Sequence, residues 1–373
     1  MTNTKIRAIG AAVLVAVWVL LAGFSWFGPR TEVSEAERRP LASAPQLSLE
    51  SITEGEFMGK FEDFTLDQFP LRDTFRQIKS LFHFYAMQQL DNNDIYIKDG
   101  YAAKQLYPLN ESSVSYAVKR FNDVYTQLLK DKAANCFVTV VPDKGYYLAE
   151  KAGQLTMEYD KLYSMVKDGM PWANYIDLTG TLTADDYYRT DTHWKQECLI
   201  DAASAICNAM DVTAPKESDY TVNALERPFY GVYYGQAALP MAPDTLCLME
   251  NELLSSCSVN YLDYTAMGAK TGKVYDMDKY NEKDLYEVYL AGPRSLMIID
   301  NPNAKTDREL VVFRDSFGSS ITPLLLQDYA KVTLVDIRYI HPNQTKMFVN
   351  YEGADVLFLY STLVLNDSSA IRP

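Results

Sequence analysis

An aspartate and a histidine stand two residues apart in the segment YYRTDTHW, at Asp191 and His193. An imidazole can act as a base through one ring nitrogen when a neighbouring carboxylate fixes the other nitrogen, so the pair could supply a general base and its orienting group. Two other interpretations stay open. The aspartate or Thr192 could cap the helix predicted to follow, beside a histidine that only packs. The pair could also bind a metal, although no third ligand follows at a familiar spacing.

A serine at the end of an apolar run is the second candidate. In VVFRDSFGSSITPLLL, a predicted strand runs into Arg314, Asp315 and Ser316, and a helix is predicted to begin directly afterwards. A serine at such a turn is exposed at the carboxyl end of a sheet, beside free N–H groups that can stabilise an oxyanion. The alternative is an ordinary serine N-cap. Combined with the Asp–His pair, this serine completes a nucleophile, a base and an orienting group.

The elements that must position these residues alternate between helix and strand from about residue 112 onward. Apolar periodicity predicts helices over Val114–Lys132, Met157–Asp168 and His193–Met210, and strands over Cys136–Val141, Ala173–Leu178, Ser295–Ile299, Glu309–Phe313, Lys331–Val335 and Val356–Tyr360. This pattern indicates an α/β fold with a mainly parallel sheet covered by helices on both faces. Residues 215–293 are Tyr-rich and β-leaning, and we interpret them as an insertion near the working edge of the sheet.

The N-terminal end has a different character. Ala8–Phe27 is an uncharged run of 20 residues, about the length that spans a hydrocarbon core as a helix. Lys5 and Arg7 precede it, which predicts a cytoplasmic N-terminus and an extracytoplasmic body. A cleaved signal peptide is the alternative, but the run exceeds a usual h-region and no A-x-A site follows. We therefore expect residues 1–30 to form a single-pass membrane anchor.

Between the anchor and the α/β region, residues 31–110 read as a tether and a helical extension. Helical spacing over residues 51–90 predicts two helices broken at Pro70. DIYIKDGYAA, Asp94–Ala103, predicts a strand, an Asp–Gly turn and a second strand. The predicted catalytic domain is residues 111–373.

Composition excludes several classes of protein. The 373 residues carry a net charge of −14, so the basic footprint of a nucleic-acid-binding protein is missing. Three dispersed histidines and five dispersed cysteines do not form a zinc finger or an iron–sulfur motif. The cysteines are an odd set, of which Cys247 and Cys257 could pair across a loop.

Several segments resemble a known group of proteins. Asp315, Ser316 and Phe317 resemble the G-D-S block of the SGNH hydrolase superfamily, and YYRTDTHW resembles the Asp-x-His block of its acyltransferase branch, the alginate O-acetyltransferase proteins and the bacterial DHHW family. Four further segments resemble other parts of that group: SEAERRPLA, FEDFTLDQFPLRD, VPDK and LVDIRY. Two positions depart from the pattern, because Arg314 replaces the glycine of G-D-S and Thr192 replaces the first histidine of D-H-H-W.

The resemblance implies an SGNH-like three-layer sandwich in which Ser316 is the nucleophile, His193 the base and Asp191 its orienter, with no cofactor and no metal. For the oxyanion hole, the resemblance implies the Ser316 N–H as one hydrogen-bond donor. Four further residues are candidates to line a substrate site: Arg338, Tyr339, Lys144 and Trp194. For Arg338, an ion pair with Asp336 is the alternative.

The same resemblance implies a membrane-anchored, extracytoplasmic O-acetyltransferase that modifies a cell-surface polysaccharide through an acetyl-serine. Acetyl-CoA is not available outside the cell, so an integral-membrane acyltransferase is the implied acetyl donor. A carbohydrate acetylesterase would use the same triad with water as the acceptor. A non-catalytic cell-surface assembly protein on this fold is the third hypothesis.

Overall fold

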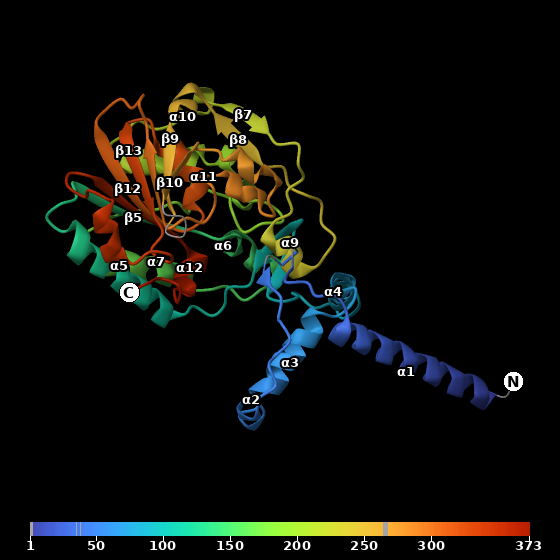
Figure 1. Ribbon diagram of the computed structural model, residues 1–373. Coiled ribbons are helices and arrows are strands. Elements are labelled where there is room, and N and C mark those ends of the chain that lie inside the picture. The colour runs from blue at the N-terminus through green and yellow to red at the C-terminus, as the bar shows by residue number, and fades with distance from the viewer. Residues whose placement is uncertain (1–2, 35, 38, 264–267) are drawn as a thin grey trace. The chain divides into compact units, whose positions relative to one another are not determined.

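The computed structural model describes residues 3–34, 36–37, 39–263 and 268–373 (Figure 1). The chain divides into two compact units. The first contains residues 1–93 with 234–241, and the second contains residues 94–233 with 242–373.

An eight-stranded sheet organises the second unit, in the order β10-β9-β11-β13-β12-β14-β5-β6. Its strands are β5 (Asn135–Val141), β6 (Asn174–Ile176), β9 (Ser258–Asp263), β10 (Gly268–Gly272), β11 (Leu296–Asp300), β12 (Arg308–Arg314), β13 (Tyr329–Val335) and β14 (Asp355–Ser361). The five strands from β13 to β6 are parallel, whereas β11, β9 and β10 pair antiparallel at the other edge. All six predicted strands are therefore present, in a mainly parallel sheet.

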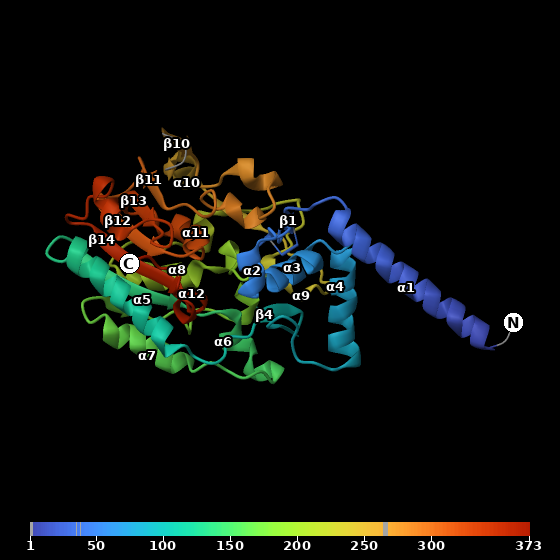
Figure 2. The same ribbon diagram turned by 60° about the horizontal axis from the view of Figure 1, so that its bottom comes forward.

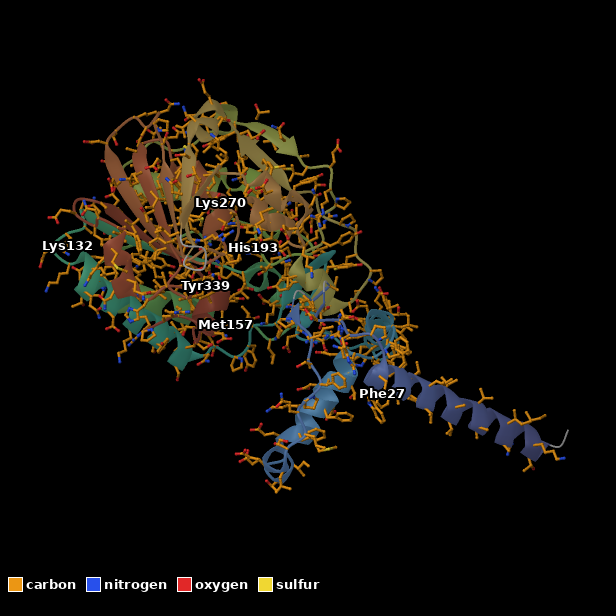
Figure 3. The ribbon with its side chains drawn as sticks, viewed as in Figure 1. Phe27, Lys132, Met157, His193, Lys270 and Tyr339 are labelled. Atoms are coloured by element: carbon orange, nitrogen blue, oxygen red, sulfur yellow. The ribbon has the colours of Figure 1, made fainter. Side chains whose placement is uncertain are left out.

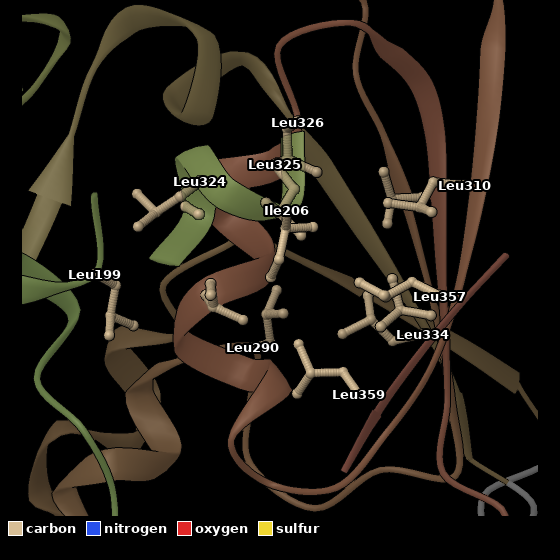
Figure 4. Close-up of a cluster of buried hydrophobic side chains, with 14 of the residues drawn as sticks. Leu199, Ile206, Leu290, Leu310, Leu324, Leu325, Leu326, Leu334, Leu357 and Leu359 are labelled. Carbon is tan, nitrogen blue, oxygen red and sulfur yellow. The ribbon is translucent and has the colours of Figure 1, made fainter. Parts of the chain in front are cut away.

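Both faces of the sheet are buried. Successive side chains of a strand point to opposite sides of the sheet, so a strand buried on both faces contributes to two apolar clusters. In β14, Leu357 and Leu359 join one apolar cluster while Val356 and Phe358 join the other. The first cluster is closed by α8 (Ile200–Ala209) and α11 (Gly318–Ile321), as Figure 4 shows in part. The second is closed by α5 (Glu111–Val124), α7 (Tyr159–Gly169) and α12 (Thr362–Asn366), which group together in both ribbon views (Figures 1 and 2). The predicted three-layer α/β fold is confirmed.

Two predicted helices begin later or end sooner than the pattern suggests. The helix expected from His193 starts only at Ile200, because residues 187–194 fold back on themselves through a Tyr187–Trp194 bridge and a hydrogen bond from Tyr188 N to His193 O (3.0 Å). The helix after Ser316 has four residues and continues as the 3₁₀ turn η9 (Thr322–Leu325), since Pro323 lacks the N–H that an α-helix needs.

Part of the predicted insertion extends the main sheet. Residues 258–263 and 268–272 form strands at its antiparallel edge, and the other described elements of 215–293 lie outside it. This remainder contains η6 (Glu217–Asp219), β7 (Thr221–Ala224), α9 (Val232–Ala237), β8 (Cys247–Glu250), α10 (Glu252–Ser256), η7 (Met277–Asn281) and η8 (Leu285–Val288). All five cysteines are free, so Cys247 and Cys257 do not pair.

Short elements complete the second unit. They are β3 (Ile95–Lys98), β4 (Tyr101–Lys104), η2 (Tyr125–Leu129), α6 (Lys144–Leu148), η3 (Glu150–Ala152), η4 (Ala184–Asp186), η5 (Gln196–Cys198) and η10 (Pro342–Met347). The predicted hairpin is confirmed: β3 pairs with β4, and Asp99 and Gly100 both adopt the positive φ of a tight hairpin turn.

The first unit begins with α1 (Asn3–Phe27), followed by β1 (Val33–Ser34), β2 (Arg39–Pro40), α2 (Leu49–Thr53), α3 (Glu56–Asp67), α4 (Arg72–Leu81) and η1 (Phe82–Ala86). The predicted helix break at Pro70 is confirmed. Within residues 4–27, an 18-residue stretch has a mean hydropathy of 2.3, so α1 is long and apolar enough to cross a membrane; a signal sequence meets the same criteria.

Candidate active site

The three residues of the predicted triad meet although 123 positions of sequence separate His193 from Ser316. His193 Nδ1 lies 2.6 Å from Asp191 Oδ1, and His193 Nε2 lies 2.8 Å from Ser316 Oγ. Asp191 is completely buried, His193 is 7% exposed and Ser316 is half-buried. With a proton on Nδ1 directed at the carboxylate, Nε2 is free to accept the Ser316 proton. The arrangement can therefore activate a serine hydroxyl as a nucleophile.

The Asp191 carboxylate is held from both sides. Its Oδ1 also accepts a hydrogen bond from His193 N (3.0 Å), and its Oδ2 accepts one from Val232 N (2.9 Å). Gly231 lies against it so closely that a Cβ at that position would come within 2.2 Å of Asp191 Cβ. Glycine is thus required there, and the Gly231–Val232 segment of the predicted insertion fixes the orienting carboxylate.

A second carboxylate from the same region holds the backbone ahead of Asp191. Asp244 accepts hydrogen bonds from Arg189 N (2.8 Å) and Thr190 N (2.8 Å), and from Thr190 Oγ1 (2.5 Å). Each bond to a charged acceptor contributes about 1.5–3 kcal/mol. Asp244 therefore stabilises the loop that carries the base, and the sequence gives no local signal for this role.

The imidazole of His193 is itself packed against an aromatic ring. Tyr286 stacks on it with ring centroids 3.8 Å apart and planes 8° from parallel, and Phe317 lies 5.0 Å away at a tilt. The Tyr286 hydroxyl is 2.8 Å from Ser320 Oγ. Burial raises the pKa of Tyr286 above its usual range, so this hydroxyl stays neutral. Tyr286 was not among the predicted site residues, although it belongs to the Tyr-rich stretch.

The turn that presents Ser316 is braced by the preceding aspartate. Asp315 is completely buried, and its Oδ1 accepts a hydrogen bond from Phe317 N (3.0 Å). Its Oδ2 accepts from both the N–H and the hydroxyl of Ser361, at 2.7 Å each. Within the described residues the Ser316 N–H has no acceptor, so it is available to bind an oxyanion.

Arg314, which stands in place of the G-D-S glycine, is buried beneath this turn. Its Nη1 donates to Asp315 O (3.2 Å), and Nε and Nη2 have no partner within the described part of the chain. Burial lowers its pKa. A Cβ on Gly318 would lie 2.8 Å from Arg314 Cβ, so the arginine stem fills the space beside a residue that must be glycine.

Two of the predicted substrate-lining residues are internal in this structure. Trp194 is fully buried, and its Nε1 donates to Phe317 O (3.1 Å) and Ser320 Oγ (2.9 Å). Lys144 is 2% exposed, and its Nζ donates to Tyr188 O (2.8 Å). Each ties the His193 loop to a neighbouring element. Contact of either residue with substrate stays a prediction.

The other two lie after β13. Arg338 makes a bidentate ion pair with Asp336, through Nε to Oδ1 (2.9 Å) and Nη2 to Oδ2 (2.7 Å), so the ion pair named as the alternative is present. Tyr339 is 49% exposed (Figure 3). Their contact with substrate also stays a prediction. Among the described residues, no group of three or more His, Cys, Asp or Glu side chains is placed to hold a metal ion.

One protein-family model matches part of the chain that contains this geometry. Residues 163–335 match the model of the DHHW protein family. The resemblance to the DHHW family is confirmed. The matched DHHW region contains Asp191, His193 and Ser316, together with Tyr286 and Asp244. No curated protein matches the sequence.

Solved structures show the same fold at low sequence identity. A DHHW family protein from Eubacterium siraeum is 21% identical with a TM-score of 0.58, over 75% of this chain and 95% of that one. Bacillus cereus PatB1 with a sulfonyl adduct is 19% identical with a TM-score of 0.58, over 73% and 95%. The O-acetyltransferase domain of Pseudomonas putida AlgJ is 13% identical with a TM-score of 0.44, over 73% and 92%, too low to inform this chain. The first two similarities confirm the predicted SGNH-like α/β fold.

Proposed function

We propose that this protein is a membrane-anchored, extracytoplasmic serine O-acetyltransferase that transfers acetyl groups to a cell-surface polysaccharide. The observation that carries the proposal is the unbroken hydrogen-bonded series from Asp191 through His193 to Ser316. The DHHW resemblance and the apolar helix α1 support the chemistry and the location, respectively.

The proposed reaction has two halves. His193 Nε2 takes the Ser316 proton while Oγ attacks the acetyl carbonyl of the donor; the donor oxygen then leaves with that proton, and acetyl-Ser316 remains. A sugar hydroxyl next attacks acetyl-Ser316 and gives its proton to His193. The sugar–acetyl bond forms as the bond to Oγ breaks, and Oγ recovers the proton. Asp191 stabilises the transient imidazolium, and the Ser316 N–H stabilises the oxyanion in both halves.

The donor outside the cytoplasm must be an acetyl carrier other than soluble acetyl-CoA. An integral-membrane acyltransferase that presents an exported acetyl group is the proposed partner. Water can replace the sugar in the second half of the reaction, which would make the protein an acetylesterase. The acceptor therefore decides between the two activities.

Full-length protein and the variant Ser316→Ala should be incubated with p-nitrophenyl acetate, with and without cellopentaose or chitopentaose. We expect nitrophenol release to fall by about 10³-fold or more in the variant, an acetyl adduct on Ser316 by mass spectrometry, and acetylated oligosaccharide. Ser369→Ala removes an exposed serine hydroxyl elsewhere and should leave all three unchanged. Acetate release without sugar acetylation would favour the esterase. Equal rates for Ser316→Ala, with no adduct on the wild type, would favour a non-catalytic protein.

A further inference from the structure

Large apolar side chains are exposed unevenly along the described chain. Beyond α1, residues 28–93 expose 14 of them, whereas the much longer range 94–373 exposes eight. Folded proteins scatter such residues singly over their surfaces, and a concentration of them marks an interaction surface. The surface in question therefore belongs to the first unit.

The largest group follows a single helical face. Five apolar residues recur at intervals of four and three, one at the N-cap of α4 and four within α4 and η1, and each is between 46% and 77% exposed. We call this set the α4 stripe: Leu71, Phe75, Ile78, Phe82 and Tyr85. Because residues three and four apart lie on one side of a helix, the stripe forms one continuous apolar face.

The polar side of the same helix points into the first unit. Arg76 Nη2 donates to Gly235 O (2.8 Å), and Ser80 Oγ donates to Ala237 O (2.6 Å). Arg72 forms a 2.5 Å ion pair with Glu37. A helix at the surface of a water-soluble protein buries its apolar face and exposes its polar one. In α4 the polar side is buried and the apolar side is exposed, as expected for a helix whose outer face contacts an apolar environment.

The α4 stripe begins beside the end of α1. Ser25 Oγ donates to Thr65 O in α3 (2.9 Å), and Trp26 and Phe61 place their rings 5.8 Å apart. Phe24 and Leu71 line one hollow of about 480 Å³. The apolar surface of α1 is thus continuous with the stripe within a single unit.

We propose that the α4 stripe lies in the boundary between headgroups and acyl chains of the bilayer that α1 enters. Phe75, Phe82 and Tyr85 are aromatic, and aromatic rings favour that boundary. Lys79 is exposed next to the stripe, where its stem can follow apolar surface while its ammonium reaches lipid phosphate. The stripe holds the first unit against the membrane. This inference rests on the membrane anchoring by α1 proposed above, and it does not depend on catalysis at Ser316.

The full-length chain, reconstituted in vesicles of phosphatidylcholine and phosphatidylglycerol, tests the proposal. Ile78→Cys and Phe82→Cys place a nitrobenzoxadiazole label on the stripe. Gln77→Cys is the matched control, since Gln77 is exposed on another side of the same helix. The chain without an added cysteine gives the background from the native thiols. Thermal unfolding checks that each labelled protein is folded.

Lipids with nitroxide-labelled acyl chains should quench positions 78 and 82 several-fold more than position 77. Equal quenching at the three positions would overturn the proposal. Quenching that is absent from the stripe, with energy transfer between differently labelled copies instead, would also overturn it and would assign the stripe to a second copy of the chain.

Discussion

Tyr286 lies flat against the imidazole of His193, with ring centroids 3.8 Å apart. Its hydroxyl is bonded to Ser320 Oγ, which also accepts the Trp194 Nε1 hydrogen. Trp194 is the residue after His193, so the base and the ring that covers it share one anchor on the Ser316 side of the site. This relationship fixes the plane of the imidazole independently of Asp191.

Replacing Tyr286 should therefore separate ring stacking from hydrogen bonding. Tyr286→Phe keeps the flat ring and loses the hydroxyl contacts with Ser320 Oγ (2.8 Å) and Ser316 O (3.3 Å), so we expect kcat for an acetyl ester to fall by less than about tenfold. Tyr286→Leu removes the ring, frees the imidazole to tilt, and should lower kcat by about 10²-fold. Initial rates for both variants, with circular dichroism to confirm folding, measure the difference. Equal losses would show that stacking does not orient His193.

Lys144 should make stability depend on pH. Burial lowers its pKa from 10.5 to about 7, while the carboxylates of Asp191, Asp244 and Asp143 oppose that shift. The unfolded chain thus holds this proton up to about pH 10.5, and the folded protein releases it near pH 7. The contribution of Lys144 to the free energy of unfolding therefore rises as the pH increases from about 7 to 10.5, by up to about 1.4 kcal/mol per pH unit. Below about pH 7 this contribution is constant.

Lys144→Met is the comparison that isolates this effect, because the tyrosines and cysteines that titrate at high pH are common to both proteins. We expect the free energy of unfolding in urea, wild type minus variant, to increase between pH 7 and pH 9.5. A difference that stays constant over this range would show that Lys144 keeps an ordinary pKa.

The sequence predicts the triad because each member carries a local signature. Asp191 and His193 are two residues apart, and Ser316 follows a recognisable strand. Residue type and position in the sequence are therefore enough to choose these three residues, without any interatomic distance. The Arg338–Asp336 pair is predictable for the same reason, since its partners are two residues apart. The parallel sheet follows from short apolar runs separated by helices.

The residues that hold the triad in place could not be predicted in this way. Tyr286 and Asp244 reach the His193 loop only through tertiary contacts, and no spacing in the sequence connects them with it. Lys144 and Trp194 show a related difficulty: a charged or amphipathic side chain suggests a surface role, whereas the fold buries both. Residue type indicates what chemistry is possible, and packing decides which side chains can reach a substrate.

Gly231 offers a test of how tightly that packing controls catalysis. A Cβ at this position would lie 2.2 Å from Asp191 Cβ and 2.3 Å from its Cα, so Gly231→Ala must displace the backbone that carries the orienting carboxylate. Overpacking of this kind costs about 1–3 kcal/mol of stability, and the displaced carboxylate should lower kcat by about 10²-fold. Thermal unfolding and acetyl-ester turnover measure the two effects.

Gly180→Ala is the matched control. Within the described part of the chain, no atom other than its immediate neighbours lies within 4 Å of a Cβ placed at Gly180, and its φ is not in the left-handed region. We expect this variant to keep wild-type turnover and an unchanged or slightly higher unfolding temperature, because alanine restricts the unfolded chain. If Gly231→Ala also kept wild-type turnover, the position of Asp191 would tolerate movement, and orientation by the Gly231–Val232 segment would not contribute to catalysis.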